Sequence, residues 1–253
     1  MKPFILAETN WKTIKDQKIE LAVLPWGATE AHNYHLPFAT DNIMVERIAI
    51  ESAQKAWDNG SKVIVLPTIP FGVNTGQMDI QLNINLNPST QFAILNDVIE
   101  VLNRHEIYKF LILNGHGGND FKQMIRESGL RYPRMFICNC NWYQSFKNSD
   151  FFENSGGHAD EMETSMIQFL SPESVLPLKE AGNGNSKKFK IKALNENWAW
   201  AERKWTQVTS DTGIGDPSKA TPGKGEKCFN EVISKISKLM LELSKADIND
   251  MYE

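Results

Sequence analysis

The sequence predicts an α/β fold, a three-layer α/β/α sandwich with a mostly parallel central sheet. Short apolar runs of strand length alternate with longer segments whose apolar residues recur at helical spacing. This alternation favours parallel strands joined by helices that cover both faces of the sheet. No clear linker or internal repeat divides the 253 residues, so we predict a single domain over residues 1–253.

Five segments have the length and composition of strands. Residues 20–26 (ELAVLPW), 62–67 (KVIVLP) and 110–113 (FLIL) are nearly continuous apolar runs, as in strands that are buried on both faces. Residues 79–86 (DIQLNINL) alternate polar and apolar positions, as a half-buried strand does. Residues 134–141 (RMFICNCN) complete the set of predicted strands.

The segments that separate these strands have helical periodicity. We expect Thr40 or Asp41 to cap the first helix and Ser89 or Thr90 to cap the second. Residues 186–211 are polar and rich in tryptophan, with weak periodicity, and could cover a pocket or contact a neighbouring subunit. The predicted helices cover residues 42–57, 91–104, 120–130, 160–170 and 224–245.

Composition and charge exclude several classes of partner. The net charge of −4 provides no basic surface for nucleic acid or for an anionic membrane. No apolar run reaches the roughly 18 residues that a membrane-spanning helix needs, and the first residues lack a signal-peptide core. Three cysteines argue against a disulfide framework. We therefore predict a cytoplasmic protein that binds neither nucleic acid nor a membrane.

The five histidines are concentrated beside acids. Only His105 stands apart, at the end of a predicted helix. In parallel sheets, ligands gather at the carboxyl ends of the strands, and two of the histidine-bearing loops follow predicted strands. Sets of imidazoles and carboxylates bind Zn²⁺, Mn²⁺ or Fe²⁺. The sequence therefore predicts a metal site formed by loops that carry His32, His35, His116 and His158.

The first of these loops follows residues 20–26. Glu30 and His32 are two positions apart, so an extended backbone directs both side chains to one side. Asp41, at the start of the next helix, can reach back to the same point. The alternative is a polar loop that ends in an ordinary helix cap.

The second loop, NGHGGN, follows residues 110–113. Its glycines allow the backbone to approach closely around His116, and its N–H groups can cradle an anion, so Asn114, Gly117 and Gly118 are candidate substrate contacts. The spacing matches neither common nucleotide-binding glycine motif. The alternative is a structural histidine held by hydrogen bonds.

The third stretch, GGHADEMETS, opens the helix predicted over residues 160–170. Glu163 lies in its first turns, where a side chain can point inward, whereas we expect Asp160 and Glu161 on the solvated face. The alternative is simple charge compensation, because acids stabilise helix N-termini.

Four motifs together resemble the creatininase (creatinine amidohydrolase) family. They are LPWGATEAHNYHLPFATDN, NGHGGN, GGHADEMETS and TGIGDPSKATPGKG, and they occur in the order typical of the family over most of the chain. The resemblance implies a single creatininase-like α/β domain, assembly into homo-oligomers that are often hexamers, and one or two divalent ions of Zn, Mn or Fe. It also implies hydrolysis of non-peptide C–N bonds.

The resemblance also implies ligand assignments. Glu30, Asp41 and His116 would hold one ion, and Asp41 would bridge to a second ion held by His32 and one further carboxylate. Creatininase has a liganding glutamate where this chain has Gly118, which argues against creatinine as the substrate. The last ligand is then expected to be Glu163, with Glu161 as the alternative.

The catalytic expectations follow from the same resemblance. His158 matches the catalytic histidine of the family and would deliver a proton to the leaving nitrogen, and Glu163 is expected to act with it. His35 is expected to orient a ligand or to contact the substrate. The predicted function is therefore metal-dependent hydrolysis of a cyclic amide, a formamide or a related small molecule. The alternatives are a family hydrolase acting on a keto-inositol or a peptide-derived substrate, and a non-catalytic protein that binds an anion or small molecule.

Overall fold

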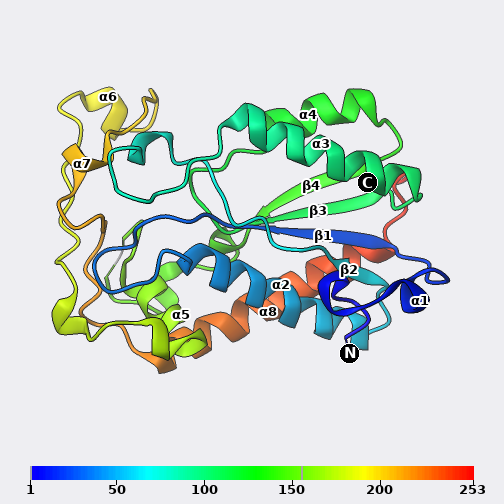
Figure 1. The fold of residues 1–253 in the computed structure, drawn as a ribbon, viewed down its shortest axis with the longest axis horizontal. Coiled ribbons are helices and arrows are strands. Elements are labelled where there is room, and N and C mark those ends of the chain that lie inside the picture. The colour runs from blue at the N-terminus through cyan, green and yellow to red at the C-terminus, as the bar shows by residue number, and fades with distance from the viewer. Residues whose placement is uncertain (1, 155) are drawn as a thin grey trace.

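The central sheet is parallel throughout. A computed structural model describes residues 2–154 and 156–253. Its sheet has the strand order β2-β1-β3-β4, and each neighbouring pair is parallel (Figure 1). The strands are β1 (Leu21–Trp26), β2 (Val63–Val65), β3 (Lys109–Asn114) and β4 (Phe136–Asn141).

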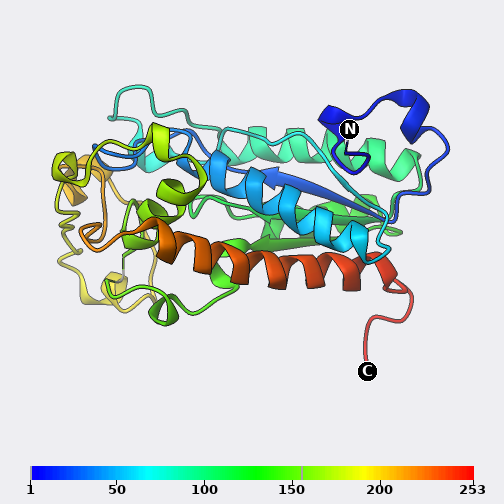
Figure 2. The ribbon, with the colours of Figure 1, turned by 90° about the horizontal axis from the view of Figure 1, so that it is seen from below.

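Helices cover both faces of this sheet, as Figures 1 and 2 show. Alternate residues of β1 separate two cores: Leu21 and Val23 pack on the side of α2, α5 and α8, whereas Ala22 and Leu24 pack on the side of α3 and α4. The predicted three-layer α/β/α class is confirmed. The helices are α1 (Trp11–Ile14), α2 (Thr40–Asp58), α3 (Pro88–Arg104), α4 (Lys122–Arg131), α5 (Glu161–Leu170), α6 (Lys192–Asn195), α7 (Trp205–Val208) and α8 (Pro222–Lys245).

The largest helices follow the predicted periodicity. The apolar stripe of α8 is buried and packs against α2 and α5, so burial of one helical face holds this layer together. Within residues 2–154 and 156–253, no helix combines the length and the apolarity needed to cross a membrane.

The strand predicted over residues 79–86 is wrong. This segment is a loop in which Ile84 and Asn85 form only isolated bridges, to Thr29 and Gly72. Its side chains instead make hydrogen bonds to the loop that follows β1: Asn83 Oδ1 accepts from the backbone N–H of Ala31 at 2.8 Å. Alternating polarity here reflects contacts to a loop rather than pairing in a sheet.

The predicted side-chain caps of the first two long helices are also wrong. The N-cap of α2 is Ala39, and the hydroxyl of Thr40 donates to the Pro37 carbonyl instead. The N-cap of α3 is Asn87, whose side chain makes no capping bond, and Pro88 occupies the first helical turn. Because α2 begins at Thr40, Asp41 lies in its first turn and is free for another role.

Candidate metal centre

Side chains from distant parts of the chain meet at the carboxyl edge of the sheet. This edge lies on the left of Figure 1, where α5 and α7 are found. A cavity of about 660 Å³ opens there, and Glu30, Asp41, His116, His158 and Glu163 are among the residues that line it. We call the following residues the central cluster: Glu30, His32, Asp41, His116, His158 and Glu163.

Asp41 lies between two of the histidines. Its Oδ2 is 3.0 Å from His116 Nδ1, and its Oδ1 is 3.3 Å from His32 Nε2. Glu30 Oε1 is 2.9 Å from His116 Nδ1, and Glu163 Oε2 is 3.8 Å from His32 Nε2. The two oxygens of Asp41 can therefore contribute to two neighbouring sites, one beside His116 and one beside His32.

Three sets of donor atoms in the central cluster each lie within 4.8 Å of one another. We call them the first, second and third sets. The first set is Glu30, Asp41 and His116; the second set is His32, Asp41 and Glu163; the third set is Glu30, His32 and His158.

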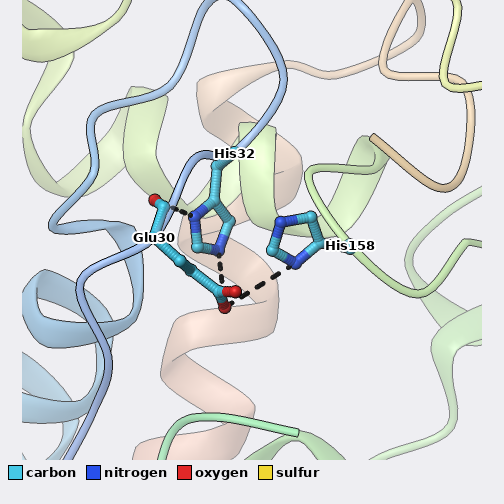
Figure 3. A group of neighbouring side chains, drawn as sticks. All are labelled: Glu30, His32 and His158. Atoms are coloured by element: carbon cyan, nitrogen blue, oxygen red, sulfur yellow. Dashed lines mark hydrogen bonds and ion pairs between the residues drawn. The ribbon is translucent and has the colours of Figure 1, made fainter. Parts of the chain in front are cut away.

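Each histidine ring of the central cluster is fixed by the backbone. One ring nitrogen lies within hydrogen-bond distance of a carbonyl oxygen, and because a carbonyl only accepts, that nitrogen carries the hydrogen. The other nitrogen then faces the carboxylates, as Figure 3 shows for His32 and His158 beside Glu30. The three bonds are His32 Nδ1 to Glu30 O (3.1 Å), His116 Nε2 to Val73 O (3.0 Å) and His158 Nε2 to Ala31 O (2.8 Å).

The electrostatics of the cluster favour a cation. Burial alone would lower the pKa of His32, but the charges of Asp41, Glu163 and Glu30 raise it to about 10. Burial would likewise lower the pKa of His116, and Glu30 and Asp41 raise it well above its usual value. Burial would raise the pKa of Asp41, but the nearby histidines hold it well below its usual range. The carboxylate is therefore ionised in a buried place and requires positive charge nearby.

The donor atoms fit a divalent metal. Buried His32 Nε2 has no hydrogen-bond partner among the described residues, although it points at carboxylates. A ligating histidine typically donates its other N–H to a backbone carbonyl, as the three rings do here. Mixed nitrogen and oxygen donors suit Zn²⁺, Mn²⁺ and Fe²⁺.

Comparison with known proteins agrees with this geometry. The creatininase (creatinine amidohydrolase) family profile matches residues 7–240. The chain belongs to the creatininase family. The resemblance inferred from the four motifs is therefore confirmed, and the chain is a member of a family of hydrolases.

Three relatives illustrate the breadth of the creatininase family. The crystal structure of a candidate creatinine amidohydrolase from Bacteroides fragilis NCTC 9343 is 40% identical, covers 100% of both chains and has a TM-score of 0.93. The mycofactocin precursor peptide peptidase of Mycolicibacterium smegmatis is 25% identical over 221 residues, which are 85% of this chain and 82% of that protein. A creatininase with Mn, 19% identical, shares the fold with a TM-score of 0.80 over 97% of this chain and 100% of its own.

Two side-chain amides, linked by a hydrogen bond, hold the carboxylate of Glu30 in place. Gln77 Nε2 donates to Glu30 Oε2, and Asn83 Nδ2 donates to Gln77 Oε1 at 2.6 Å. Sequence reasoning missed Asn83 because residues 79–86 are predicted as a strand, and it missed Gln77 because no motif singles it out. Their polar character was visible in the sequence, but it gave no sign of which carboxylate they would meet.

The glycine at position 118 is required by the fold of this loop. A Cβ at Gly118 would overlap the Val73 carbonyl oxygen and His116 Nε2, which are the two partners of the bond that orients the His116 ring. Position 118 thus has no room for a liganding side chain while that bond exists. At Gly117, by contrast, a Cβ would meet nothing within 4 Å. Both glycines line the cavity.

Two predicted substrate contacts lie away from the cavity. His35 is 1% exposed, and its Nε2 is 2.9 Å from Thr164 Oγ1 behind the cluster. Asn114 is buried, donates to the His116 carbonyl and to Asn141 Oδ1, and accepts from the His116 N–H. Neither residue is among those that line the cavity, because internal hydrogen bonds hold both side chains. Asn114 instead shapes the loop that carries His116.

The expectation that Asp160 and Glu161 face solvent is wrong. Both are buried. Asp160 caps α5 by accepting from two backbone N–H groups, and burial raises its pKa to about 7, with the charge of Glu163 adding to the effect. Glu161 Oε1 pairs with Lys224 Nζ at 2.5 Å, and its Oε2 accepts from the Asn154 N–H at 2.7 Å. Both oxygens of Glu161 therefore bind partners outside the central cluster. Glu163 is the acid of α5 that reaches the cluster.

Part of the tryptophan-rich segment over residues 186–211 lies beside the cavity. Trp200 and Arg203 line it, and Trp205 meets the His158 ring edge-on with centroids 5.3 Å apart. Glu202 ties this segment to the loop that carries Gln77, because its Oε2 accepts from Thr75 Oγ1 at 3.1 Å. The segment forms one wall of the cavity.

Proposed function

We propose that this creatininase-family protein is a metal-dependent amidohydrolase that cleaves C–N bonds other than peptide bonds in small molecules such as cyclic amides or formamides. One observation carries the proposal: three buried imidazoles each give one N–H to the backbone and turn the other nitrogen towards buried carboxylates. Such an arrangement is expected of ligands, because the second nitrogen of each ring needs positive charge, from a metal ion or from a proton, to lie beside these carboxylates.

The first and second sets would hold one ion each, with Asp41 shared between them. Glu30 and His116 complete the first set, and His32 and Glu163 complete the second. Divalent ions of Zn, Mn or Fe would supply Lewis acidity there and lower the pKa of a water molecule to about 7. Gln77 keeps one oxygen of Glu30 occupied, so the other oxygen remains directed at His116.

His158 is the residue proposed to move a proton. Its Nε2–H is held by the Ala31 carbonyl at 2.8 Å, so Nδ1 is the atom that can exchange protons with a substrate. An amide nitrogen is a poor leaving group and needs a proton as the C–N bond breaks. The ring of Trp205 packs against His158 and limits its rotation. Gly117 leaves its side of the cavity open for the substrate, whereas the absence of a side chain at Gly118 makes room for the bond that orients His116.

Metal analysis combined with a substrate panel tests the proposal. Purified protein should contain stoichiometric Zn, Mn or Fe by plasma mass spectrometry, and should hydrolyse at least one member of a panel of formamides, cyclic amides and keto-inositols. Glu30→Gln should lose metal and activity, whereas Glu46→Gln, on the exposed side of α2, should keep both. Protein without metal, or a Glu30→Gln variant with full metal content, would contradict the proposal.

A peptide-derived substrate is the second candidate. The mycobacterial relative is named as a peptidase, and the cavity of about 660 Å³ is bordered by Trp200, which is 83% exposed and available to an extended chain. Including short peptides in the same panel separates the two candidates, because only one class of substrate would be turned over. Hexameric assembly and a cytoplasmic location remain predictions.

A further inference from the structure

The third set contains a pair of stacked histidines that the two proposed ion positions do not explain. The rings of His32 and His158 lie 4.1 Å apart at 30°, with the Glu30 carboxylate beside both (Figure 3). Glu30 Oε1 is 3.9 Å from His158 Nδ1 and 4.0 Å from His32 Nε2. All three side chains are buried.

These separations are too long for hydrogen bonds but suit two ligands of one ion. A hydrogen bond between nitrogen and oxygen spans about 2.7–3.2 Å. Nitrogen and oxygen ligands lie about 2.0–2.2 Å from Zn²⁺, so two ligands of one ion can be up to about 4.3 Å apart. The separations of His32 Nε2 from Asp41 and Glu163 in the second set, 3.3 and 3.8 Å, fall in the same range. The separations in the third set, 3.9 and 4.0 Å, are longer than these but remain within the reach of one ion.

The ring orientation of His158 matches that of the proposed ligands. With Nε2–H held by the Ala31 carbonyl, a neutral His158 directs its Nδ1 lone pair at the oxygen that His32 Nε2 also faces. When His32 is neutral as well, two lone pairs and a carboxylate oxygen converge in a buried place. A cation among them would remove this repulsion.

We propose that the ion held by His32 has two alternative positions: one on Asp41 and Glu163, the second set, and one on Glu30 and His158, the third set. The two exclude each other, because the single lone pair of His32 Nε2 binds one ion at a time. This inference rests on the proposed function and extends it. When the ion occupies the third set, His158 Nδ1 is a ligand and cannot exchange a proton with the substrate, so this position is inactive.

The proposal makes Glu163 and His158 interchangeable for retaining the ion. The wild-type protein, Glu163→Gln, His158→Ala and the double variant are stripped with chelator, reloaded with Zn²⁺ and counted by plasma mass spectrometry. Each single variant should keep the same number of ions as the wild type, and the double variant should bind one ion fewer. His105→Ala, which removes an exposed histidine from the C-terminal end of α3, is the matched control and should bind as the wild type does.

Crystals of Glu163→Gln give a second readout that does not depend on the double variant folding. Anomalous diffraction at the zinc edge should place an ion within about 2.3 Å of His158 Nδ1. Loss of the His32 ion in Glu163→Gln alone, or an ion that stays more than about 3 Å from His158 Nδ1, overturns the inference and leaves the proposed function standing. The same holds for a wild type with an ion in the first set only. A wild type that binds no ion overturns both.

Discussion

The loop that follows β1 carries two buried histidines, His32 and His35, whose pKa values are shifted in opposite directions. On the side of the cluster, burial would lower the pKa of His32, but Asp41 and the neighbouring acids raise it to about 10. On the opposite side, burial lowers the pKa of His35 to about 4, the charge of His32 adds to this, and Asp211 offsets only part of it. Burial alone therefore says little about function, and carboxylates decide which histidine attracts a cation.

Removing the carboxylate of Asp41, which the first and second sets share, should have the largest effect on the difference between His32 and His35. Asp41→Asn takes one donor from both the first and second sets, so metal affinity should fall by more than the roughly 10–100-fold typical of losing a second-shell partner. The pKa of His32 should also fall, because Asp41 is the chief cause of its increase. Isothermal titration with Zn²⁺ measures the affinity, and Glu46→Gln on the same helix is the control. Unchanged affinity would show that Asp41 is not a ligand.

Alanine substitutions at the adjacent glycines Gly117 and Gly118 should have a smaller effect on zinc affinity, and the first serves as the control for the second. Gly118→Ala forces apart the Val73 carbonyl and His116 Nε2, so the His116 ring loses its orienting bond, and zinc affinity should fall roughly 10–100-fold. Gly117→Ala adds a Cβ to open space and should leave affinity within about twofold. Equal affinities for the two variants would mean that the backbone bond does not position the ring.

In chelated protein, the stability contributed by His32 should decline at alkaline pH. Its folded pKa, about 10, lies above the usual 6.5, so the charged ring stabilises the metal-free fold fully below pH 6.5. This contribution is lost as the pH rises through 10. Urea unfolding from pH 6 to 10 should show a steeper decline in the wild type than in His32→Gln, in which the raised pKa of His116 still contributes. Parallel curves would place the cause elsewhere.

His35 should act in the opposite direction and at acid pH. Because its folded pKa of about 4 lies below 6.5, the unfolded chain binds more protons in this window, and the fold loses stability as the pH falls from 6.5 towards 4. The loss attributable to His35 is about 2 kcal/mol at pH 5. His35→Gln keeps a polar partner for Thr164 and should flatten this part of the curve relative to the wild type. An unchanged slope would show that folding does not lower the pKa of His35.

The sequence predicted the parts of the molecule that depend on local periodicity. The apolar runs and the stripe of α8 gave the layers, and the histidines beside acids pointed to the cluster. Pairings between distant segments were not visible. Lys224 neutralises Glu161 from 63 residues away and allows it to be buried, and Gln77 reaches Glu30 from 47 residues away. His32 and His35 could not be distinguished because only the folded chain brings Asp41 to one of them.

The three rings of the central cluster are anchored by main-chain oxygens rather than by neighbouring side chains. Exchanging a residue of the cavity wall, such as Trp200 or Arg203, therefore leaves the atoms that fix the imidazole planes untouched. The orientation of these rings and the lining of the cavity can thus change independently of each other. The pocket therefore has two separate parts, one positioned by the backbone and one made of exchangeable side chains.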